Sequence, residues 1–178
     1  MTAQNQNPME WLEPIYREHS KAVIQTAYRV TGNAEDAEDV LQTVFTRLAR
    51  RTDPPDLSGG ALPYLRRAAT NAALDIVQSK RVKTSVAFDG VGEATTSDPA
   101  PRPDNIFQGR EAHRILRQAV AKLSRRSAEV FTLRYFEDMD NTSIAAALGT
   151  SPGTVAVTLH RVREKLKAEM TPLMGGNR

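Results

Sequence analysis

Apolar side chains recur along most of this sequence at steps of three and four residues, the spacing of one face of an α-helix. The pattern predicts long helices over residues 9–30, 34–51 and 63–81. It resumes near Ile106 and continues into the C-terminal part of the chain. No alternation of apolar and polar residues typical of a strand has any length. The sequence therefore predicts an all-α fold.

Turn-forming residues separate the first three helices. Gly32 tolerates the left-handed conformation at which helices commonly end, and Asn33 is a favoured cap for the helix that follows. Two prolines and a glycine pair predict a loop over residues 52–60. Pro63 then suits the first turn of the third helix.

Prolines mark a second, longer interruption. Residues 82–105 contain Pro99, Pro101 and Pro103 and have little periodic apolar content, which predicts a flexible linker. We therefore expect two helical domains, over residues 1–81 and 106–178.

The clearest local pattern lies between Asp138 and Arg163 and predicts two helices joined by a tight turn. Asp140 or Asn141 can cap the first helix, Gly149 suits the turn, and Pro152 suits the first position of the second helix. The second helix carries an apolar stripe of Val155, Leu159, Val162 and Leu166. This is the pattern of a DNA-binding helix-turn-helix, and the alternative is a helical hairpin inside an ordinary all-α core.

Composition narrows the function classes. The chain has no cysteine, and its three histidines lie far apart in the sequence, so we expect no disulfide, no metal site, no cofactor and no catalytic residues. The N-terminal segment lacks the basic and apolar parts of a signal peptide, and no apolar run approaches the roughly twenty residues that span a membrane. We expect a cytoplasmic protein without membrane insertion.

Charge is distributed unevenly. Residues 111–178 contain 11 Lys+Arg and 7 Asp+Glu, whereas residues 1–110 contain 13 and 14. A basic C-terminal third that carries a helix-turn-helix fits a DNA partner, because phosphate neutralisation supplies much of such affinity. The acidic start of the second helix, at residues 35–39, has two interpretations: favourable helix-dipole electrostatics, or a patch that docks a partner.

Two blocks of sequence carry a family resemblance. The first runs from Asp36 to Val40, continues with Gln42 and Phe45, and resumes over residues 64–75. The second covers residues 123–166. In this order, with a variable linker between them, they resemble the two domains of the extracytoplasmic-function (ECF) sigma factors, the smallest members of the main bacterial sigma family.

The resemblance implies a sigma factor that binds core RNA polymerase, directs it to promoter DNA and assists melting. The polymerase contacts would be the β′ clamp helices and the β flap, and an anti-sigma factor is a further expected partner. The implied polymerase-binding residues are Asp36, Glu38, Asp39 and Gln42.

The resemblance also implies two DNA-binding surfaces. The loop and third helix would bind the minus-ten element through Ser58, Gly59, Gly60, Arg66, Arg67, Asn71, Asp75, Gln78, Lys80 and Arg81. The second domain would bind the minus-thirty-five element through Arg125, Arg126, Ser151, Pro152, Gly153, Thr154, Val157, Thr158 and Arg161. Ala156 and Val157 stand where the family usually has basic or polar residues, which favours recognition through thymine methyl groups and DNA shape.

Two other function classes compete with this interpretation. A conventional regulator would use the helix-turn-helix to bind an operator, commonly as a dimer, and would not need a basic third helix that carries Asn71. An enzyme is disfavoured because the sequence has no Gly-rich phosphate loop and only dispersed histidines.

Overall fold

The computed structural model describes residues 8–51, 53–87 and 104–174, and within them the chain is all-α. The described elements are α1 (Pro8–Thr31), α2 (Ala34–Ala49), α3 (Ala61–Ala87), α4 (Asp104–Ala121), α5 (Arg125–Tyr135), α6 (Asn141–Leu148) and α7 (Pro152–Met174). The all-α prediction is confirmed. No helix in the described part of the chain is long and apolar enough to cross a membrane.

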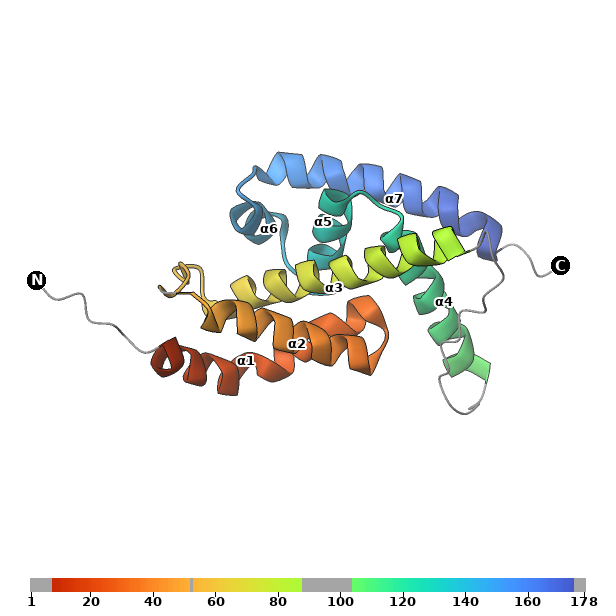
Figure 1. Cartoon of the computed structure of the whole chain (residues 1–178). Helices are drawn as coiled ribbons and strands as arrows, with labels where there is room; N and C mark the ends of the chain where they lie inside the picture. The colour runs from red at the N-terminus through yellow and green to blue at the C-terminus, as the bar shows by residue number, and fades with distance from the viewer. Residues whose placement is uncertain (1–7, 52, 88–103, 175–178) are drawn as a thin grey trace, which may run out of the picture.

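Helices α1, α2 and α3 pack against one another along one side of the molecule (Figure 1). The turn between α1 and α2 follows the predicted chemistry: Gly32 has a φ of 68°, and the Asn33 side chain accepts a hydrogen bond from the Asp36 N–H at 2.9 Å. Val23, Val40 and other apolar residues of the predicted faces are fully buried. The first domain thus forms its core as the apolar spacing predicts.

The helix-turn-helix is confirmed as α6 and α7. The Asp140 side chain accepts from the Ser143 N–H at 2.7 Å, so Asp140 rather than Asn141 caps α6. Gly149 adopts the left-handed conformation with φ 60°, and the Ser151 hydroxyl accepts from the Thr154 N–H at 3.1 Å. All four residues of the predicted stripe on α7 are buried: Val155, Leu159, Val162 and Leu166.

The predicted linker boundaries are wrong at their N-terminal end. Helix α3 continues from Arg81 to Ala87, and its first residue is Ala61 rather than Pro63. The reason is local, since residues 82–87 contain neither Pro nor Gly and nothing in them stops a helix. Helix α4 begins at Asp104, two residues before the expected domain start, and the rest of the expected linker, with its three prolines, lies outside the described residues.

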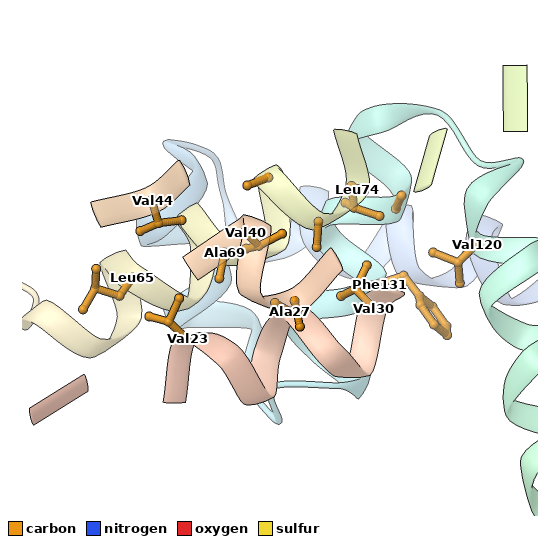
Figure 2. Packing of buried hydrophobic residues seen from close by; sticks show 14 of the residues in the cluster. Val23, Ala27, Val30, Val40, Val44, Leu65, Ala69, Leu74, Val120 and Phe131 are labelled. Carbon is orange, nitrogen blue, oxygen red and sulfur yellow. The ribbon is translucent and has the colours of Figure 1, made fainter. Parts of the chain in front are cut away.

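The two domains pack directly against each other. Helix α3 lies between α1 and α2 on one side and the helices of the second domain on the other (Figure 1). One buried cluster includes Leu65 and Leu74 of α3 together with Val120 of α4 and Phe131 of α5 (Figure 2). A second cluster, centred on Leu133 and other residues of α5, α6 and α7, holds the helix-turn-helix together. The helices that follow Asp104 are therefore folded back against α1, α2 and α3, with α3 at the contact.

Candidate nucleic-acid interface

A groove between α2 and α3 gathers cationic, aromatic and amide side chains. It has a volume of about 360 Å³ and is lined by Val44, Arg47, Leu48, Arg51, Tyr64, Arg67, Ala68 and Asn71. Of these residues, Arg67 and Asn71 are among the predicted minus-ten contacts, whereas Arg47, Arg51 and Tyr64 are not. The spacing of Arg47 and Arg51, one turn of helix apart, was the available signal, because it places both guanidinium groups on one side of α2.

The second domain places a carboxylate against this groove. Glu129 of α5 is 5% exposed, and its Oε1 accepts hydrogen bonds from Arg67 Nε at 3.1 Å and Asn71 Nδ2 at 2.9 Å. Its other oxygen accepts from Arg126 Nη1 at 3.4 Å. Because two partners are cationic, the buried charge is compensated.

A second carboxylate of the second domain, that of Glu137, is buried against the first domain. The side chain of Glu137 is 0% exposed and accepts from the Thr26 hydroxyl at 2.8 Å and from Arg29 Nη1 at 3.1 Å. Arg66 Nε lies 3.2 Å from its Oε2. Arg29 also donates to the backbone carbonyl of Phe136. Three side chains from α1 and α3 therefore converge on one acidic group that follows α5.

The other predicted minus-ten side chains of α3 also contact protein groups. Arg125 of α5 forms an ion pair with Asp75. Gln78 donates to the carbonyl of Leu123, and Arg81 donates to the carbonyl of Ala121 at the end of α4, where helix carbonyls lack partners within the helix. The face of α3 turned toward the second domain includes residues spaced by four, three and four positions: Arg67, Asn71, Leu74 and Gln78.

The loop before α3 lies in the open. Ser58, Gly59 and Gly60 are exposed, and Gly60 has a φ of 91°, which only glycine adopts readily. The Ser58 N–H donates to the Asp56 carboxylate at 2.9 Å, and this hydrogen bond holds the pKa of Asp56 below its ordinary value. The conformation of the loop therefore depends on contacts within the loop itself, and its residues are accessible to a ligand.

The acidic start of α2 divides into a buried and an exposed part. Asp36 is 9% exposed and forms an ion pair with Lys80 of α3 at 2.7 Å, so it does not lie on the free surface with the rest of the predicted set. Asp36 is buried because it lies one turn before Val40, on the side of α2 that packs against the other helices. Glu38, Asp39 and Gln42 are exposed.

An apolar groove adjoins the exposed residues of α2. It has a volume of about 370 Å³ and is lined by Leu12, Glu13, Tyr16, Leu41, Gln42, Phe45, Thr46 and Ala49. The rings of Tyr16 and Phe45 meet edge to face with centroids 4.8 Å apart. Tyr16 is 46% exposed, which is unusual for a large apolar ring in a helix that packs on two others.

Helix α7, the second helix of the helix-turn-helix, presents most of its predicted DNA-binding residues to solvent. Ser151, Pro152, Gly153, Thr154 and Arg161 are exposed, Val157 is 51% exposed, and Thr158 is half-buried with its hydroxyl donating to the Thr154 carbonyl. Arg125 and Arg126 are not part of this surface. Arg125 contacts α3, and Arg126 donates to the carbonyl of Leu148 and to Glu129.

No group of three or more His, Cys, Asp or Glu side chains that could hold a metal ion occurs among the described residues. The described residues thus form a groove lined by three arginines, an exposed acidic face on α2 and an exposed face on α7.

Comparison with known proteins agrees with this geometry. The model of Sigma-70 region 2 matches residues 15–82, and that of Sigma-70 region 4 matches residues 113–166. The chain is 30% identical over 159 residues to the RNA polymerase sigma-E factor of Streptomyces coelicolor, covering 89% of this chain and 85% of that protein. The chain belongs to the ECF sigma factors.

Other sigma factors show the same relationship. The chain is 27% identical to the ECF sigma factor SigW of Bacillus subtilis over 157 residues, with 85% of this chain and 84% of SigW covered. It is 29% identical to the ECF sigma factor SigE of Mycolicibacterium smegmatis over 167 residues, or 92% of this chain and 63% of that longer protein. The family resemblance seen in the sequence is confirmed.

A solved structure shares the fold. The sigma factor RpoE of Bartonella quintana, determined in complex with the anti-sigma factor NepR, superposes with a TM-score of 0.57 over 96% of this chain and 99% of that one, at 16% identity. As an ECF sigma factor, the chain directs RNA polymerase to promoters, and its partners are core RNA polymerase and promoter DNA. The operator-binding alternative is not favoured.

Proposed function

We propose that the domain formed by α1, α2 and α3 binds core RNA polymerase and opens the minus-ten element, while the domain of α4 to α7 binds the minus-thirty-five element. The observation that carries this proposal is the groove between α2 and α3, which combines three arginines with Tyr64 and Asn71. We further propose that the chain acts in the cytoplasm as an initiation factor and not as an enzyme, without metal or cofactor.

The minus-ten role follows from the chemistry of the groove. Melting requires a base to leave the stack and enter a protein pocket, and aromatic rings and amide edges hold such bases. Tyr64 supplies a ring, Asn71 supplies an amide, and Arg47 and Arg51 supply positive charge for the backbone. The exposed loop at Gly59 and Gly60 allows close approach of the nucleotide.

The polymerase role is assigned to the exposed side of α2. Glu38, Asp39 and Gln42 would contact the β′ clamp helices, and the apolar groove beside them, with its exposed Tyr16, offers the desolvated centre that protein interfaces need. Asp36 is assigned a structural role through Lys80. The second domain would contact the β flap.

The minus-thirty-five role is assigned to the first three turns of α7. Thr154 and Thr158 can reach bases or phosphates, Arg161 neutralises a phosphate, and Val157 offers an apolar surface to a thymine methyl group. The structural neighbour was solved with an anti-sigma factor, and a protein of that kind is an additional proposed partner of this chain.

The test is capture of bacterial core RNA polymerase by this chain, followed by open-complex formation on a pool of promoter fragments. We expect stable capture and melting confined to a few fragments. Asp39→Lys should weaken capture about tenfold, because a reversed charge at an interface costs of the order of a kcal/mol or more. Glu18→Lys is the matched control, since Glu18 is an exposed acidic residue on a different side of α1 from the groove.

Equal capture by wild type and Asp39→Lys would contradict the assignment of α2. Failure to capture polymerase, combined with tight binding to some duplex, would contradict the proposed division of labour as a whole.

A further inference from the structure

We propose that the groove between α2 and α3 selects guanine, which Arg51 recognises through the O6 and N7 atoms of the base while the base stacks on the ring of Tyr64. This inference rests on the minus-ten role proposed above. It adds the identity of the base that the groove takes, and it gives Arg51 a contact with that base in addition to the charge that it provides.

The groove combines apolar surface with exposed charge. Its apolar lining residues are buried or half-buried: Val44, Leu48 and Ala68. Arg47 and Arg51 line the groove from α2 and are exposed, and Tyr64 lines it from α3 and is half-buried. Aromatic rings stack on the faces of bases, whose edges then stay available for hydrogen bonds. A base held on Tyr64 can therefore turn its edge toward an arginine of the groove.

The side chains that line the groove are rich in hydrogen-bond donors and poor in acceptors. Each of the three arginines carries five N–H donors and no acceptor, and no carboxylate is among the lining residues. Guanine presents two acceptors, O6 and N7, on one edge, whereas adenine and cytosine present on that edge an amino group that needs an acceptor. The lining therefore favours a base whose edge accepts hydrogen bonds.

The shape of a guanidinium group distinguishes guanine from thymine as well. The group is a planar fork whose N–H donors match two neighbouring acceptors. O6 and N7 of guanine form such a pair, and an arginine bound to this pair is the commonest specific contact with a base. Thymine presents O4 beside a methyl group on the same edge and offers no second acceptor there. An arginine therefore selects guanine from the two bases that lack an amino group on this edge or carry acceptors on it.

Arg51 is the arginine best prepared for this contact. Its Nε donates to the backbone carbonyl of Asp53 at 3.3 Å, so the two terminal nitrogens are the ones that a base can bind. Because this hydrogen bond restrains the side chain, less conformational entropy is lost when the fork binds. Arg67, by contrast, already uses its Nε on the buried carboxylate of Glu129. We therefore assign the base to Arg51.

The position of Arg51 also fits a nucleotide that has left the stack. Arg51 follows the end of α2 at Ala49, and Tyr64 lies in the first turn of α3, which begins at Ala61. The loop that joins these two helix ends contains the exposed Gly59 and Gly60. The arginine, the ring and the accessible loop are therefore at the same end of the groove.

The experiment uses holoenzyme, formed from core RNA polymerase and the full chain, on the promoter that open-complex selection enriches most strongly. Its minus-ten region is mismatched, so that the strand is already single. Each guanine of the minus-ten strand is replaced in turn by 7-deazaguanine, which lacks the N7 acceptor and keeps the Watson–Crick edge. Affinity is measured by fluorescence anisotropy.

Two matched variants are compared with the wild type. Arg51→Lys keeps the positive charge and loses the planar fork. Arg50→Lys is the control, because Arg50 is the neighbouring exposed arginine and does not line the groove. Since both positions are exposed, neither substitution should disturb the fold.

At one guanine of the minus-ten strand, 7-deazaguanine should weaken binding by the wild type at least about fivefold, the lower end of what a bidentate contact contributes. The same replacement should have almost no effect in Arg51→Lys and its full effect in Arg50→Lys. Enriched promoters without guanine in the minus-ten strand would overturn the proposal. An absent effect of 7-deazaguanine in the wild type, or an equal effect in wild type and Arg51→Lys, would also overturn it.

The minus-ten role of the groove fails in a different way. The double variant Arg47→Ala with Arg51→Ala should form open complexes on the fully paired promoter at least about tenfold less well than the wild type, because both phosphate and base contacts are lost. Unchanged open-complex formation would contradict the minus-ten role itself. A loss of open complexes without any effect of 7-deazaguanine would leave that role in place and would overturn only the selection of guanine.

Discussion

The two surfaces proposed to contact DNA differ in how they are presented. The groove between α2 and α3 has Arg67 and Asn71 bonded to Glu129, whereas the start of α7 exposes Thr154 and Val157 to solvent. The interface between the domains therefore involves one of the two surfaces only. A free chain arranged in this way presents its duplex-reading helix while its strand-binding groove is engaged by protein.

The largest effect is expected from a substitution that destabilises the helix-turn-helix and with it the exposed surface of α7. Ile144 of α6 is fully buried in the cluster that joins α6 to α7. Ile144→Ala should lower the free energy of unfolding by about 2–5 kcal/mol, through lost apolar contacts and a cavity. Denaturant unfolding and duplex binding measure the effect. Val157→Ala, at an exposed position on α7, is the control that should leave stability nearly unchanged.

The covered surface is tested by comparing two arginines of one groove. Arg67 lines the groove and also donates to Glu129, whereas Arg51 lines the groove and donates to the backbone carbonyl of Asp53. Arg67→Ala should lower the free energy of unfolding by about 1–3 kcal/mol, because Glu129 keeps its burial and loses a cationic partner. Arg51→Ala should not. Equal stability of the two variants would contradict a structural role for the Arg67–Glu129 pair.

Two substitutions on α7 distinguish a charge contact with the DNA backbone from an apolar contact with a base. Arg161→Ala should weaken duplex binding across all sequences and reduce the salt slope of log K by about 1, as expected for one lost phosphate contact. Val157→Ala should instead alter preference at a single A·T position, by about 1 kcal/mol. Titrations at several salt concentrations on a set of single-base variants distinguish the two. A base-specific effect of Arg161→Ala would assign it to readout and not to the backbone.

The smallest expected effect is a pH dependence of the exposed surface. Hydrogen bonds to Asp140, first among them from the Ser143 N–H, hold the pKa of this carboxyl below its ordinary value. A carboxyl with a lowered folded pKa stabilises the fold above its unfolded pKa and loses that contribution as pH falls through the folded pKa. Thermal melts should therefore show Asp140→Ala approaching wild-type stability in acid. A constant difference down to the lowest pH would contradict the capping role.

The elements themselves could be predicted from the sequence because their signals are local. Caps at Asn33 and Asp140 and the turn at Gly149 depend on neighbours within a few residues, and the apolar faces follow the helical repeat. The helix-turn-helix was therefore located in full. The predicted end of α3 is too early. Residues 82–87 carry no signal that stops a helix, but the Pro-rich composition of the segment that follows them led to their assignment to the linker.

The arrangement of the domains could not be predicted in this way. The apolar spacing of α3 indicates one buried face, which contains Leu65, Ala69 and Ala72, but Thr70 and Leu74, on the other side of the helix, are also fully buried. The basic and amide residues around Leu74 suggested a solvent-facing or DNA-facing side, and only the position of α5 explains their partners. Asp36 shows the same limit, because its pairing with Lys80 depends on how α2 and α3 meet. Spacing identifies a face, and tertiary contacts decide what covers it.

The composition of the α3 face has a consequence for colloidal behaviour. If the domains part, the newly wetted side of α3 presents Arg67, Asn71 and Gln78 around Leu74. Large contiguous apolar patches promote aggregation, and charged or amide groups interrupt such patches. The opened chain should therefore remain monodisperse at concentrations where an apolar interface of the same extent would precipitate. A sigma factor with this α3 face should therefore stay monodisperse before it binds polymerase, whether its domains are packed together or apart.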